Sequence, residues 1–175
     1  MLKNRLCVIS LAMGMSLASL SWAVALSEDI KARIKEASSV FLGAADPSVT
    51  PARILKSILD LLDITAALTH ASQYKTDIQY RIDVAKDLFH KESMFNEKGR
   101  QYLYLAYRQM TDGRKYERPK ELDEFVTPTE AQEKAQKYGQ NLVDEALGQI
   151  DAGKPGEAAR LLLELVLMIV TPISG

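Results

Sequence analysis

The chain has 175 residues and a formal net charge of −1, from 22 Lys and Arg residues against 23 Asp and Glu residues. This mild acidity predicts solubility and gives no general attraction to nucleic acid. Its one cysteine, Cys7, lies near the start, so the rest of the chain cannot supply a catalytic thiol, a Cys-ligated zinc site, an iron–sulfur cluster or a covalent haem attachment.

Residues 1–25 have the pattern of a cleavable secretory signal peptide. Lys3 and Arg5 give a positive start, an apolar run covers residues 6–20, and Ala23-Val24-Ala25 places small residues at the cleavage positions. Cleavage after this site would leave 20 basic and 23 acidic residues, a net charge of −3. The pattern predicts a periplasmic protein with no stable transmembrane segment after cleavage. An uncleaved anchor is the alternative, because the apolar run is just long enough to cross a bilayer.

Apolar residues at helical spacing predict a first helix over residues 27–45, which Asp46-Pro47-Ser48 would end. Thr50-Pro51 predicts the start of a second helix, with Thr as the N-cap and Pro at the first helical position, running to about residue 71. A third helix is predicted from residue 74 to residue 89. No glycine or proline separates the second helix from the third, so one long rod remains an alternative.

A fourth helix is predicted to begin at Asn96-Glu97 and to end at Asp112-Gly113. Residues 114–126 are polar and include Pro119, which predicts a loop with one helical turn. The pattern Thr127-Pro128-Thr129-Glu130 predicts the start of a fifth helix with a capping box.

The last two predicted helices form a C-terminal hairpin. Gly153 ends the fifth helix, Pro155 opens the sixth, and Thr171-Pro172 ends it. Residues 26–175 therefore predict an all-α, single-domain bundle of about five to six helices.

The last helix is apolar on every side over residues 161–170, except at Glu164. All-round apolarity requires cover on all sides, and ten residues are too few to span a membrane. One interpretation is a helix buried at the centre of the bundle. The other is a helix with a second face that packs on a partner or a second subunit. The residues of that predicted interface are Leu161, Leu165, Val166 and Ile169.

A possible internal duplication relates residues 99–126 to residues 139–166, with eight of 28 positions identical at an offset of 40. Each copy would be a helix, a glycine turn and a second helix. Arg118-Pro119 counts against a second helix in the earlier copy.

A metal site is one candidate for a ligand site. Asp83, Asp87 and His90 stand at helical spacing on one face, and Asp87 to His90 resembles half of a di-metal carboxylate-x-x-His motif. That architecture needs a second motif, and the other histidine, His70, has Ala67 at the matching position. A solvated helix face is the alternative.

An anion site is the other candidate, in the segment 97–120, which carries a local charge of +4. Arginine forks bind carboxylates and phosphates, and an aromatic ring between them offers a stacking surface. The predicted ligand-binding residues are Arg100, Tyr104, Arg108 and Arg114. The alternative is a solvated face whose arginines pair with neighbouring carboxylates.

No catalytic or cofactor-binding motif is present, and no cofactor is predicted. The sequence favours an exported, non-catalytic protein that binds a protein partner or assembles with itself. A bundle that binds a small anion or a metal is the alternative.

Overall fold

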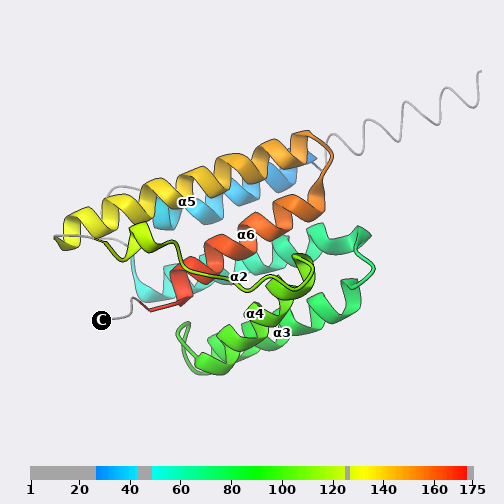
Figure 1. The fold of residues 1–175 in the computed structure, drawn as a ribbon, viewed down its shortest axis with the longest axis horizontal. Helices are drawn as coiled ribbons and strands as arrows, with labels where there is room; N and C mark the ends of the chain where they lie inside the picture. Colours follow the sequence, from blue (N-terminus) through cyan, green and yellow to red (C-terminus); the bar gives the residue numbers. More distant parts are fainter. Residues whose placement is uncertain (1–26, 43–48, 125–126, 173–175) are drawn as a thin grey trace, which may run out of the picture.

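The computed structural model describes residues 27–42, 49–124 and 127–172. All regular secondary structure in these ranges is helical (Figure 1). It contains six α-helices and two short 3-10 turns around one hydrophobic core. The predicted all-α bundle is confirmed. The signal-peptide prediction for residues 1–25 and the break predicted at residues 46–48 lie outside the described residues.

The second and third predicted helices are separate. Residues 27–42 are helical, and α2 (Pro51–Leu68) follows, with the Thr50 hydroxyl accepting a hydrogen bond from the backbone N–H of Arg53 at 3.3 Å. The 3-10 turn η1 (Thr69–Ala71) then ends this run, and α3 (Lys75–Lys91) turns back and packs against α2. The one-rod alternative is therefore excluded.

The fourth helix, α4 (Glu97–Met110), has the predicted cap. The Asn96 side-chain oxygen accepts a hydrogen bond from the backbone N–H of Gly99 at 2.7 Å. The chain leaves α4 through Asp112 and Gly113, whose φ angles of 51° and 96° are in the left-handed region. The following loop contains one 3-10 turn, η2 (Lys120–Leu122), as predicted.

The C-terminal hairpin consists of α5 (Pro128–Asp151) and α6 (Pro155–Val170). The Thr127 hydroxyl caps α5 by accepting from the backbone N–H of Glu130 at 3.2 Å, and Gly153 makes the turn with φ 68°. The earlier half of the proposed duplication does not form a matching hairpin. Pro119 removes a backbone donor and restricts the residue before it, and only the turn η2 forms there.

The last helix, α6, is the centre of the bundle. It packs against α2, α4 and α5, and Figure 1 shows it between α5 on one side and the α3–α4 hairpin on the other. The chain's own helices therefore provide the cover that its apolar surface requires. This corrects the predicted partner interface: Leu161, Leu165 and Val166 are buried, and Ile169 is partly buried against the core.

Two glycines allow close helix packing. A Cβ on Gly99 would lie 2.5 Å from Cε1 of Phe89, where α4 meets α3. A Cβ on Gly139 would lie 2.7 Å from Cδ2 of Leu42, where α5 meets the helix of residues 27–42. Within the described ranges, no helix is both long and apolar enough to cross a membrane.

Candidate functional site

The first two residues of the predicted anion site, Arg100 and Tyr104, bind the end of α6 instead. Nη1 of Arg100 donates hydrogen bonds to the carbonyl oxygens of Phe95 at 2.6 Å and Val170 at 3.4 Å. The Tyr104 hydroxyl hydrogen-bonds the Thr171 hydroxyl at 2.9 Å. These two side chains therefore attach α4 to the carboxyl end of the central helix.

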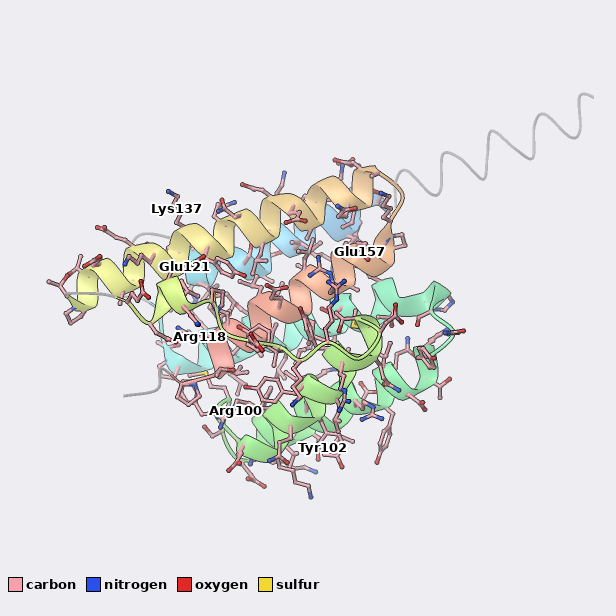
Figure 2. All side chains as sticks on the ribbon, in the orientation of Figure 1. Arg100, Tyr102, Arg118, Glu121, Lys137 and Glu157 are labelled. Atoms are coloured by element: carbon pink, nitrogen blue, oxygen red, sulfur yellow. The ribbon has the colours of Figure 1, made fainter. Side chains whose placement is uncertain are left out.

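Arg118 reaches the same end of α6 from the loop after α4 (Figure 2). Its Nη1 donates to the carbonyl oxygens of Met168 at 2.9 Å and Thr171 at 3.3 Å, and its Nε pairs with Asp123 at 2.9 Å. The last carbonyls of a helix lack intrahelical partners and carry partial negative charge, which a guanidinium satisfies. Since α6 has no basic residue in its last turn, other segments supply the cations.

The one charge in the apolar body of α6, Glu164, is the acceptor in a part-buried network. Its carboxylate accepts from the Tyr138 hydroxyl at 2.8 Å and from Nη1 of Arg160 at 3.1 Å, and Nε of Arg160 also pairs with Glu157 at 3.0 Å. Burial, and then the hydrogen bond to Glu164, raise the pKa of Tyr138 above its ordinary value. The carboxylate is thus held by the fold.

Tyr116 holds the loop after α4 against the same region. Its ring stacks on Tyr104 with centroids 6.0 Å apart and meets the edge of Tyr107 at 5.7 Å. Burial raises its pKa well above the ordinary value, and its hydroxyl has no hydrogen-bond partner among the described residues. This aromatic cluster packs the loop against α4.

The predicted metal ligands Asp83, Asp87 and His90 are exposed on α3, and Asp87 forms an ion pair with Lys91 at 2.8 Å. In the part of the chain that the structure describes, no three His, Cys, Asp or Glu side chains are grouped so that they could hold a metal ion.

Arg108, the third predicted anion ligand, lies apart from Arg100. Eight residues along a helix with 3.6 residues per turn rotate a side chain by about 80°. Arg108 therefore turns towards α3, and Arg114 is exposed in the loop. Arg108 borders a shallow surface groove between α3 and α4, which we call the α3–α4 groove. Its lining residues are Tyr74, Arg81, Leu105, Arg108, Gln109, Asp112 and Gly113.

Sequence reasoning missed Tyr74 and Arg81 as neighbours of Arg108. Both are on α3 or at its start, and Arg81 lies 27 positions before Arg108, so only the packing of α3 on α4 brings them to one groove. Neither Arg81 nor Arg108 makes a hydrogen bond or an ion pair with any described residue. These two cations are therefore open to an external acceptor.

Exposed large apolar side chains are concentrated on the α3–α4 hairpin, along the lower edge of the molecule in Figure 1. Among the described residues they are Tyr74 (43% exposed), Tyr80 (62%), Phe95 (49%) and Leu105 (43%). Two of them, Tyr74 and Leu105, line the α3–α4 groove beside its arginines. The hairpin therefore combines exposed apolar area with unpaired positive charge.

Comparison of the chain with protein-family models, with curated protein sequences and with solved structures returns no match. Because a helical bundle by itself implies no activity, function has to be argued from the side chains of this chain.

Proposed function

We propose that the protein is an exported, non-catalytic binding protein that contacts a protein partner through the outer side of the α3–α4 hairpin. One observation carries the proposal: the large apolar side chains exposed in the described part of the chain all belong to this hairpin. Adjacent exposed apolar side chains are characteristic of protein–protein contact surfaces, and Tyr74 and Leu105 line one groove here.

The polar side chains of the hairpin support a protein partner. Tyrosine and arginine are enriched at the centres of interfaces, because they bring large contact areas together with hydrogen-bond donors. Tyr74 at the start of α3, Arg81 on α3 and Arg108 on α4 border one groove, and neither arginine forms an ion pair with a described residue.

Export is the second part of the proposal and is supported by the sequence of residues 1–25. The positive start, apolar run and Ala-x-Ala site follow the order of a secretory signal peptide. Intact mass measurement of the protein purified from periplasm tests this directly. A chain beginning at Leu26 is expected, and a chain retaining residues 1–25 would contradict cleavage.

Site-specific photo-crosslinking in living cells tests the binding surface. We would place p-benzoylphenylalanine at Leu105 in the α3–α4 groove and, as a control, at Glu145, which is exposed on α5. A discrete adduct from position 105 but not from position 145 is expected. An adduct mass of two chains would identify a second copy as the partner. Adducts only from position 145, or from neither position, would contradict the proposed surface.

A further inference from the structure

Two arginines line the α3–α4 groove, and their positive charge restricts the chemistry of its ligand. Arg81 comes from α3 and Arg108 from α4, so both sides of the groove carry a guanidinium. Asp112 also lines the groove, but it forms no ion pair with either arginine. Because neither guanidinium is bonded to another described residue, the groove is electrostatically suited to bind an anion.

The chemistry of guanidinium favours a carboxylate over a neutral acceptor. Its planar donors match the two oxygens of a carboxylate, and such charge-assisted hydrogen bonds are about twice as strong as neutral ones. Arg100 on α4 and Arg118 in the following loop do not contribute here, because both are already bonded to backbone carbonyls at the end of α6.

The walls of the groove are partly apolar, so its ligand should also carry an apolar group. Tyr74 and Leu105 each leave 43% of their surface exposed beside the arginines. A free inorganic anion would leave this apolar area in contact with water, whereas an apolar side chain next to a carboxylate would cover it. Tyrosine also offers a ring face on which an aromatic or aliphatic group can pack.

We propose that the α3–α4 groove binds an acidic peptide segment of the partner protein, with an Asp or Glu carboxylate between Arg81 and Arg108 and a neighbouring apolar side chain on Tyr74 and Leu105. This rests on the proposed function and names the chemistry that the partner must present.

Two randomised peptide-display libraries test this chemistry with the full mature chain. The libraries are identical except for a fixed central residue, Glu in one and Gln in the other. The Glu library is expected to yield binders with apolar residues next to the fixed position. Replacing the fixed Glu with Gln in those binders is expected to weaken binding about tenfold, because a charge-assisted pair is lost.

Variants of the chain locate the binding. Arg81→Gln and Arg108→Gln are each expected to weaken the selected peptides about tenfold. Arg114→Gln, at an exposed arginine outside the groove, is expected to leave binding unchanged and is the matched control. Because neither groove arginine bonds to any residue in the described ranges, circular dichroism and thermal unfolding of the variants should match the parent chain.

Three results would overturn the proposal: no binders from the Glu library, equal binding of the Gln peptides, or inorganic phosphate binding as tightly as the selected peptides. Photo-crosslinking at Leu105 distinguishes a failure of the acidic-peptide proposal from a failure of the proposed binding surface. If that adduct persists unchanged in Arg81→Gln and Arg108→Gln, the surface is correct and the acidic occupant is wrong. If no adduct forms at all, the surface itself is wrong.

Discussion

Substitution of Gly99 by Ala tests the packing on which the α3–α4 hairpin depends. A Cβ at this position would lie 2.5 Å from Cε1 and 2.9 Å from Cδ1 of Phe89. The Phe89 ring is only 1% exposed, and it cannot move aside without displacing other core side chains. The added methyl group therefore has to push α4 away from α3 or force the Phe89 side chain out of its preferred rotamer.

The expected loss of stability follows from two opposing effects. Inserting a methyl group into a tightly packed site costs about 1–3 kcal/mol. Replacing glycine by alanine within a helix returns up to about 1 kcal/mol through lower backbone entropy in the unfolded chain. We expect a net loss of about 1–2 kcal/mol, which lowers the Tm by about 2–8 °C for a domain of this size.

Thermal and urea unfolding followed by circular dichroism measure this change, and α5 provides a matched control. Gly148 is an exposed glycine in that helix, and a Cβ there would have no atom within 4 Å. Gly148→Ala should therefore raise stability by about 0.5–1 kcal/mol. Adding Phe89→Leu to Gly99→Ala should destabilise less than the sum of the two single changes, because the shorter side chain removes the clash.

The reasoning would be refuted if Gly99→Ala raised the Tm as Gly148→Ala does. That result would mean that the ring of Phe89 does not lie against Gly99.

Three further changes test other parts of the structure. Leu165→Asp should unfold the monomer, at a cost above about 4 kcal/mol, because it buries a charge in the central helix. The control Leu105→Asp, at the surface, should cost less than about 1 kcal/mol. Dissociation of a folded oligomer by Leu165→Asp would contradict the central position of α6. Arg118→Ala should cost about 1–3 kcal/mol in urea unfolding, since the carbonyls of Met168 and Thr171 lose their donor, whereas Arg114→Ala should stay within about 0.5 kcal/mol. Tyr116→Phe should resist alkaline unfolding better than the parent chain, because burial raises the pKa of Tyr116 in the folded state. The free energy of unfolding of the parent chain is therefore intact below pH 10. Above pH 10 it falls by up to about 1.4 kcal/mol per pH unit, as the tyrosine ionises in the unfolded chain. Equal alkaline unfolding of the two proteins would show that Tyr116 is not buried.

Helix starts were predictable from sequence because their signals are local. Thr50, Asn96 and Thr127 each accept a hydrogen bond from a backbone N–H three residues later, so residue type and spacing were sufficient. The covering of α6 was not predictable in the same way. All-round apolarity shows that a helix must be covered, but it does not distinguish the chain's own helices from a partner.

The residues of the candidate site were predicted only in part, for geometric reasons. Arg108 was identified, but Arg100 was assigned to the same binding site although a helix rotates about 80° over their separation. Arg81 was missed because its proximity to Arg108 depends on tertiary packing of α3 on α4. The role of Arg118, whose acceptors lie 50 and 53 residues away, was inaccessible for the same reason.

The position of α6 sets the order in which the chain can complete its core during synthesis. Helices α2, α4 and α5 all precede α6 in the chain, and each packs against it. A nascent chain that has not yet reached residue 155 therefore lacks the element that joins these helices, and their apolar faces remain in contact with water or with a chaperone. The core is therefore completed only after α6 has been synthesised, and any product truncated before α6 should be a substrate for proteases instead of a smaller stable domain.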